Sequence, residues 1–124
     1  PTTICLTLAV LLGSVGESWS ADLQKGLDAV NRGDFSTALR EWRPLAEQGD
    51  ASAQNNLGFM YVYGKGVLQN YVRAHMWFNI AASSGGSKNS SKSRDNVAKK
   101  MTPSQVEKAQ KLARECVRKR YKGC

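Results

Sequence analysis

Apolar and small side chains recur at four-residue steps in two similar stretches of the chain, residues 34–50 and 70–86. A shift of 36 residues superposes the stretches and matches Ala38 with Ala74, Trp42 with Phe78, Ala46 with Ala82, and Gly49 with Gly85. The spacing predicts one helix in each stretch, with a narrow apolar stripe along it. Asp34 and Asn70 are the expected N-caps, because a short polar side chain can accept hydrogen bonds from the free N–H groups of the first turn.

A further helix is expected before each of these stretches, at residues 22–31 and 51–63. Gly58 lies in the middle of the second one, where glycine costs about 1 kcal/mol relative to alanine, and this indicates a closely approaching neighbour. Pro44 is expected to kink its helix near Trp42, because proline removes a backbone donor and crowds a carbonyl of the preceding turn. Two helices per unit, repeated at a period in the mid-thirties, predict an all-α fold: a short right-handed α-solenoid of about three antiparallel helix pairs with a C-terminal capping helix.

The last third of the chain is predicted to cap this solenoid. Residues 83–93 (SSGGSKNSSKS) are small and polar, and they predict a linker or a loose loop before a short helix at residues 94–101. Thr102 and Gln105 match a capping box that begins a final helix. Lysines and arginines of that helix lie opposite an apolar face made of Val106, Ala109, Leu112, Ala113, Cys116 and Val117. A terminal repeat needs a polar outer face, so this helix is the predicted cap.

The first residues of the chain have the pattern of a secretory signal. Ile4 to Leu12 is a short, nearly uncharged apolar run, and small residues follow it up to Ser20. The run is shorter than the roughly 20 apolar residues of a membrane span. We predict a signal peptide at residues 1–20, cleaved after Ser20. A buried N-terminal helix and a tail anchor are the alternatives.

Residues 51–85 carry small and aromatic residues at fixed positions, namely Ala53-Gln54, Leu57-Gly58, Tyr61, Gly64, Gly66-Val67, Ala74, Trp77-Phe78, Ala81-Ala82 and Gly85. This set resembles the SEL-one-like repeat, a relative of the tetratricopeptide repeat, in a chain of the exported bacterial type. By the resemblance, residues 21–50 are a shortened first repeat, residues 51–86 are a full repeat, and residues 87–124 are a basic C-terminal capping region.

The resemblance also implies a binding surface. In repeats of this kind the first helix of each unit lines the concave face of the solenoid and holds peptides. By that resemblance Ser52, Asn55, Phe59 and Val62 face the groove. The alternative is that these side chains only pack against the next helix, and both interpretations stay open.

Charge is unevenly distributed along the chain. Residues 1–87 carry six Lys or Arg and seven Asp or Glu, whereas residues 88–124 carry twelve and three, so the net charge of +8 belongs to the last third. Such a region either binds an anionic envelope surface or an acidic protein, or is only the solvated face of the cap. It has no interleaved aromatic residues and no known nucleic-acid motif, so nucleic acid is not an expected partner.

Two cysteines, Cys116 and Cys124, lie near the C-terminal end. If the chain is exported, its compartment permits disulfides. Gly123 lets the tail fold back after a helix that is expected to end near Tyr121, so a Cys116–Cys124 disulfide is one prediction. Alternatively, Cys116 is buried on the apolar stripe, and Cys124 is free or pairs between chains.

No catalytic or metal-binding set emerges from the sequence. His75 is the only histidine, and we expect it at an exposed or edge position. No Cys and His spacing fits a zinc site, and the stretch GKGV at residues 64–67 lacks the pattern of a phosphate-binding loop. We therefore predict a chain that is not an enzyme and has no cofactor or metal.

These observations predict an exported protein–protein interaction scaffold, periplasmic or secreted. It would bind a partner peptide or protein on its concave helical surface. The alternative is a basic protein that binds the envelope or another anionic surface through its C-terminal helix.

Overall fold

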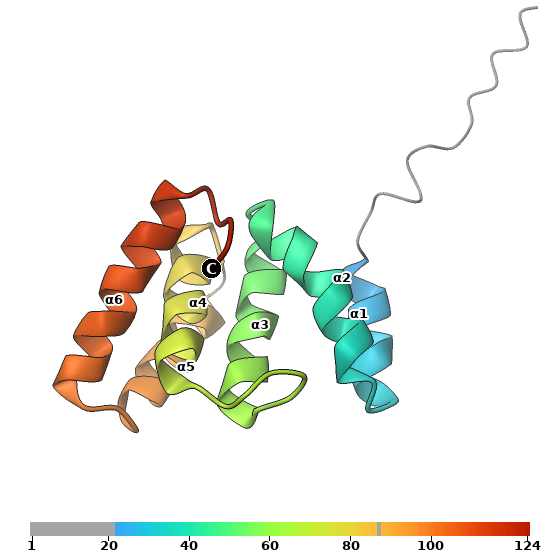
Figure 1. Ribbon diagram of the computed structural model, residues 1–124, viewed down its shortest axis with the longest axis horizontal. Coiled ribbons are helices and arrows are strands. Elements are labelled where there is room, and N and C mark those ends of the chain that lie inside the picture. Colours follow the sequence, from blue (N-terminus) through green and yellow to red (C-terminus); the bar gives the residue numbers. More distant parts are fainter. Residues whose placement is uncertain (1–21, 87) are drawn as a thin grey trace, which may run out of the picture.

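Helices make up the described part of the chain, with turns between them (Figure 1). The computed structural model describes residues 22–86 and 88–124, and the predicted signal peptide at residues 1–20 lies outside them. The helices are α1 (Leu23–Asn31), α2 (Phe35–Glu47), α3 (Ala51–Tyr63), α4 (Tyr71–Ser83), α5 (Lys88–Ala98) and α6 (Pro103–Arg118).

The helices are arranged as the neighbouring pairs of a short solenoid. α1 packs on α2, and α3 packs on α4. The pairs are joined through contacts of α2 with α3, and of α4 with both α5 and α6. Figure 1 shows these helices following one another along the long axis of the molecule. The predicted all-helical solenoid is confirmed.

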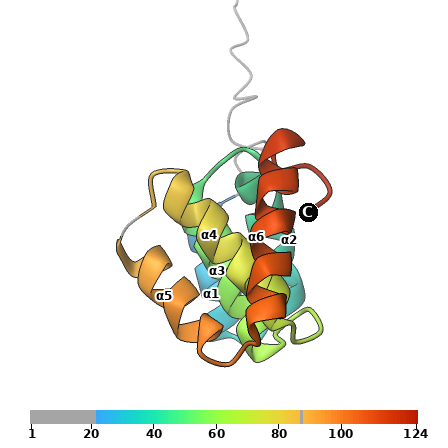
Figure 2. The same ribbon diagram turned by 90° about the vertical axis from the view of Figure 1, so that its left-hand side faces the viewer.

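The last two helices are arranged differently from the earlier pairs. α5 and α6 both pack on α4, but they do not form a comparably packed pair with each other. Figure 2 shows α5 and α6 on opposite sides of α4 at this end of the solenoid. The last unit is therefore splayed around the helix before it.

The helix starts follow the polar residues that the sequence places there. The side chains of Asp34 and Asn70 each accept a hydrogen bond of 3.1 Å from the backbone N–H three residues later. Thr102 Oγ1 accepts from the N–H of Gln105 at 3.2 Å, and Gln105 Oε1 accepts from the N–H of Thr102 at 2.9 Å. The predicted capping box is therefore present and fixes the start of α6.

Small residues allow the large side chains of the core to pack between helices. A Cβ atom at Gly58 would lie only 2.5 Å from Cε1 of Phe78, so glycine is what lets α3 approach α4. Gly26 of α1 likewise leaves room for the indole of Trp42, which lets α1 approach α2. Phe78, Trp42 and Trp77 are all buried in the core that results.

The polar stretch 83–93 was expected to be a linker, and this prediction is wrong for its second half. α5 begins at Lys88. Ser90 is buried and its hydroxyl donates to Asn55 Oδ1 at 3.1 Å, while Val97 packs against α4. Tertiary contacts of these few residues outweigh the weak helix preference of a serine-rich stretch.

The face of α6 that packs inward is shorter than the sequence predicts. Ala109, Ala113 and Cys116 are buried as expected, but Val117 is 47% exposed. Val117 lies at the edge of a furrow between α4 and α6, which is open to solvent in the described part of the chain.

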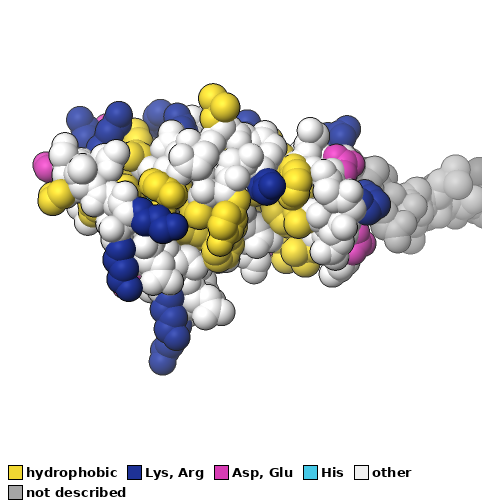
Figure 3. All heavy atoms as spheres, turned by 90° about the horizontal axis from the view of Figure 1, so that it is seen from below, with side chains coloured by type: hydrophobic (Ala, Val, Ile, Leu, Met, Phe, Trp, Pro, Cys, Tyr) yellow, Lys and Arg dark blue, Asp and Glu magenta, His cyan; other side chains and the backbone are white. Residues whose placement is uncertain are grey.

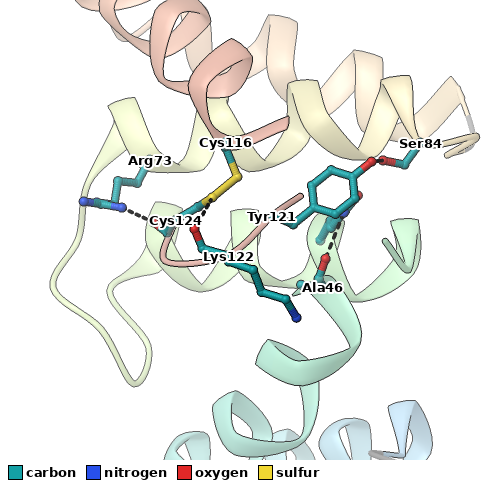
Figure 4. Close-up of a disulfide and its surroundings, with 8 residues drawn as sticks. Ala46, Arg73, Ser84, Cys116, Tyr121, Lys122 and Cys124 are labelled. Atoms are coloured by element: carbon teal, nitrogen blue, oxygen red, sulfur yellow. Dashed lines mark hydrogen bonds between the residues drawn. A yellow bond between two sulfur atoms is a disulfide. The ribbon is translucent and has the colours of Figure 1, made fainter. Parts of the chain in front are cut away.

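A disulfide joins the end of α6 to the tail that follows it (Figure 4). It links Cys116 to Cys124, with the two Cα atoms 5.7 Å apart, and so confirms one of the predicted alternatives. α6 ends at Arg118, earlier than the predicted end near Tyr121. We call residues 119–124 the C-terminal strap.

The C-terminal strap reaches from α6 to two other helices. The hydroxyl of Tyr121 lies 3.3 Å from Ser84 Oγ, just after α4, and Lys122 Nζ lies 3.7 Å from Glu47 Oε2 of α2. Arg73 of α4 donates a hydrogen bond to a main-chain oxygen of the strap. The strap therefore connects the last unit of the solenoid to the two units before it.

Candidate functional site

Two neighbouring aromatic rings form a ridge on α3. Phe59 is 39% exposed and Tyr63, one turn later, is 67% exposed. Their rings are stacked, with centroids 6.4 Å apart and an interplanar angle of 9°. The ring of Phe59 also packs edge to face on the buried ring of Phe78, with the two centroids 5.0 Å apart. This contact holds Phe59 in place. We call Phe59 and Tyr63 the aromatic ridge.

The aromatic ridge separates two shallow hollows. One, of about 150 Å³, lies between α3 and α5, and its walls include Val62, Asn96 and Lys100. The other, of about 130 Å³, lies between α3 and the first helix pair, and its walls include Phe35 and Met60. Both rings of the ridge line both hollows. A ligand placed across the ridge would reach apolar surface on either side.

A lysine stands at the edge of each hollow, held over an aromatic ring. Lys65 Nζ lies 5.2 Å from the centroid of the Phe35 ring, and Lys100 Nζ lies 5.7 Å from that of Tyr71. Figure 3 shows hydrophobic side chains gathered near the middle of the molecule in this view, with Lys and Arg side chains around them. The surface therefore combines apolar contact area with positive charge at its edges.

The structure places the predicted groove residues in three different environments. Phe59 and Val62 line the hollow between α3 and α5. Asn55 accepts the hydrogen bond from Ser90, so its side chain contacts α5 rather than the next helix, α4. Ser52 is exposed and lines neither hollow.

Sequence reasoning left out several residues of this surface. Tyr63 is one helical turn after Phe59 and lies on the same ridge, and this spacing is visible in the sequence. Asn96 and Lys100 come from α5 and the turn after it. Both lie in the short helix expected at residues 94–101, but the sequence did not indicate that this helix packs beside α3. This wall of the hollow was left out because it depends on how α5 packs, which the sequence pattern does not show.

His75 is buried, which corrects the expectation of an exposed or edge position. It is 3% exposed, and its Nδ1 has no hydrogen-bond partner among the described residues. Burial lowers the pKa of His75, the positive charge of Arg94 lowers it further, and Asp95 opposes both effects. The ring lies in α4 and lines neither hollow, so it takes no part in this surface.

The described helices contain neither a group of metal ligands nor a membrane-spanning segment. Among the described residues no three His, Cys, Asp or Glu side chains are grouped so that they could hold a metal ion. None of the helices α1–α6 combines the length and the hydropathy that crossing a membrane requires.

The part of the chain that carries the aromatic ridge matches the model of a known repeat family. The model of the Sel1 repeat matches residues 51–86, which include α3, α4 and the turn between them. The resemblance to the SEL-one-like repeat is thereby confirmed for this part of the chain. Neither the curated proteins nor the solved structures contain a match to the chain. Sel1 repeats are in general protein–protein interaction modules.

Proposed function

We propose, from the Sel1 repeat that this chain carries at residues 51–86, that it is a protein-binding module whose partner docks on the aromatic ridge of α3. The observation that supports this most is the exposure of Phe59 and Tyr63 between two apolar hollows. Large aromatic side chains with few rotatable bonds are frequent anchors of protein interfaces. The bound segment places apolar side chains in the hollows and crosses the stacked rings.

Residues at the edges of the two hollows also contact the partner in the proposed binding mode. Val62 widens the apolar wall beside the ridge, and Lys65 and Lys100 attract acidic residues that flank the apolar part of the partner segment. Ion pairs at the exposed rim of an interface contribute little affinity. They mainly favour the correct partner and speed its association. Ser52 and Asn55 have minor parts, since the first lies outside the hollows and the second contacts α5.

We also propose that the chain acts outside the cytoplasm, in the periplasm or after secretion. The pattern of residues 1–20 supports this, because an apolar run followed by small residues is typical of a cleaved secretory signal. The Cys116–Cys124 disulfide agrees with the proposal, because disulfides persist mainly in oxidising compartments.

The ridge is tested with alanine variants and a partner isolated by pull-down from the native periplasm or medium. Tyr63→Ala should weaken binding by about 2 kcal/mol or more, because it removes an anchor ring. It should leave the melting temperature nearly unchanged, because most of the ring is exposed. Phe59→Ala should weaken binding similarly but also lower stability by about 1 kcal/mol, since its ring packs on Phe78.

The controls separate binding from folding. Trp77→Ala should lower stability by about 3–5 kcal/mol, because it truncates a buried ring. Lys25→Ala, at an exposed position of α1, should change neither property. Wild-type affinity in Tyr63→Ala and in Phe59→Ala would contradict a docking site on the ridge.

A second candidate function is the binding of an anionic surface through α6. It is favoured by the charge of residues 88–124, where the ion pairs between described residues are few. Neutralising Arg118, Lys119 and Arg120 should then abolish binding, and raising the salt concentration should imitate that effect by screening. The ridge variants should have no effect in that case, so one set of measurements separates the two functions.

A further inference from the structure

The C-terminal strap lies over a furrow between α2 and α4. About 300 Å³ of space remains there, and its walls include Arg43 and Glu47 of α2 and Trp77 of α4. Tyr121 is partly buried against the core, with its hydroxyl near Ser84, as Figure 4 shows. The furrow between two successive second helices thus already holds a short non-helical segment with one aromatic side chain.

The corresponding positions of the next unit line a second furrow, between α4 and α6. The shift of 36 residues carries Arg43 to Asn79 and Glu47 to Ser83, and both of these residues line it. This furrow has a volume of about 610 Å³, and the described part of the chain sends no segment across it. We call it the open furrow.

The open furrow has an apolar floor and a basic edge. Ile80 and Ala113, which line it, are 1% and 4% exposed, and Val117 beside them is 47% exposed. Arg114 and Arg118 also line it, and neither forms an ion pair with a described residue. No Asp or Glu is among the lining residues. Its chemistry thus differs from that of the furrow under the strap, where Glu47 receives Lys122.

We infer that the open furrow binds a short acidic peptide segment of a partner protein, with one aromatic side chain placed on its apolar floor. The strap supplies the structural precedent, because Tyr121 occupies the neighbouring furrow of the same solenoid. The charge follows from Arg114 and Arg118, which carboxylates of the segment would neutralise. This surface shares no lining residue with the hollows beside the aromatic ridge.

A peptide fits the open furrow better than an anionic membrane does. For a lipid surface to use this apolar floor, apolar side chains would have to protrude from the helix and enter the bilayer. Ile80 and Ala113 instead lie at the bottom of a hollow, where a single side chain can reach them and a bilayer cannot.

The probe is a fluorescein-labelled peptide with one Phe between two short runs of Glu, measured by anisotropy with the full chain. The double variant Arg114→Glu/Arg118→Glu should weaken its binding at least about tenfold, the size expected when an interface anchor is removed. Ser83→Trp should weaken it as much without any change of charge, because the indole fills the furrow. A peptide with Ser in place of Phe should also bind about tenfold more weakly.

The matched control also replaces two positive charges by negative ones near the C-terminal end of the chain. Lys108→Glu/Lys119→Glu alters α6 and the strap but not the lining of the open furrow, and should weaken binding less than about threefold. An equal loss in this control would overturn the proposal, because binding would then depend on charge alone. Tyr63→Ala should leave the affinity for this peptide unchanged, which separates this inference from the function of the ridge.

Vesicles of phosphatidylglycerol decide between peptide and membrane. Weak, salt-sensitive vesicle binding that Ser83→Trp leaves unchanged is the expected result, because the furrow is not used. Vesicle binding that Ser83→Trp abolishes would overturn the proposal, since it would assign the open furrow to lipid. All variants should melt within about 2 °C of wild type, as expected for exposed positions. If Ser83→Trp fails to fold, the variant Arg114→Glu/Arg118→Glu, at two exposed positions, still tests the furrow.

Discussion

Single glycines determine how closely the helices of this protein approach. Gly58 faces the ring of Phe78, and Gly26 faces the indole of Trp42. In each case the missing Cβ leaves room for a ring that supplies much of the local buried area. Helix propensity and packing therefore act in opposite directions at these positions, and packing decides the residue.

Gly58→Ala tests which of the two effects is larger. Alanine favours a helix by about 1 kcal/mol over glycine. Its methyl group would lie 2.5 Å from Phe78 Cε1, and overpacking of this kind typically costs about 1–3 kcal/mol. We expect the unfolding free energy in urea to fall by about 1 kcal/mol, while Ser52→Ala, on the exposed side of α3, changes it by less than about 0.5 kcal/mol. A more stable Gly58→Ala variant would show that α3 and α4 are less closely packed.

A buried histidine makes the stability of the fold dependent on pH. His75 has its pKa lowered from the usual 6.5, chiefly because burial disfavours the charged ring. The unfolded chain therefore binds a proton at a higher pH than the folded chain does. The unfolding free energy falls as the pH drops below 6.5 and stops falling once the folded ring is also protonated.

His75→Gln should remove this dependence, because glutamine does not titrate. We expect the melting temperature of wild type to fall more than that of His75→Gln between about pH 7.5 and about pH 5.5. Carboxylates contribute equally to both proteins over this range, so the difference between the two isolates the histidine. Parallel curves would mean that His75 titrates in the folded chain as it does in water.

At the scale of helices, the sequence predicted where helices begin better than it predicted which helices pack against each other. Asp34, Asn70 and Thr102 cap where expected, because a cap depends on a few neighbouring residues. The start of α5 was placed too late, at residue 94 instead of Lys88, because its first turns depend on the contact of Ser90 with Asn55, far away in the sequence. The candidate surface was predicted in part for the same reason: one of its walls belongs to α5.

Pro44 lies inside α2 without ending it, and the kink expected near Trp42 stays a prediction. Pro44 is close to the end of the helix, and α2 remains one helix up to Glu47. A proline in the last turn removes a single hydrogen bond and leaves few residues after it to be displaced.

The C-terminal strap holds a backbone shape that its residues would not adopt alone. Arg120 and Tyr121 have φ of 55° and 65°, a left-handed conformation that is unfavourable for residues other than glycine. The disulfide and the contacts of Tyr121 with its neighbours hold the strap in this shape. Removing the disulfide should therefore loosen the whole strap rather than one bond.

Cys124→Ser measures this contribution. Opening a disulfide loop of this length should lower the unfolding free energy by about 2–3 kcal/mol. The melting temperature of wild type should fall on addition of a thiol reductant to that of the variant, and the variant should not respond. An unchanged melting temperature in Cys124→Ser would show that the strap is held by its other contacts alone.

At the scale of the whole molecule, the basic charge and the disulfide lie in the same third of the chain. Residues 88–124 carry most of the positive charge, and the open furrow and the strap both belong to this end. The aromatic ridge belongs to the central unit. The proposed export bears on both surfaces, because it decides which partners they can meet.

Export is tested on protein recovered from the periplasm or the medium. If residues 1–20 are a cleaved signal, mass spectrometry should find Ala21 as the first residue. The same chain with the apolar run interrupted by two Asp residues should stay in the cytoplasm with its N-terminal segment attached. An exported protein that retains residues 1–20 would contradict the predicted cleavage.

The C-terminal strap also changes how this repeat array can unfold. Units that touch only their neighbours can open from one end, one after another, so that the terminal helices exchange their amide hydrogens first. Here the last unit is tied to α4 through Ser84 and to α2 through Glu47. Opening the end of the array must therefore break contacts with the first unit as well. We therefore expect the strap to make unfolding of this array more cooperative than that of repeats that touch only their neighbours.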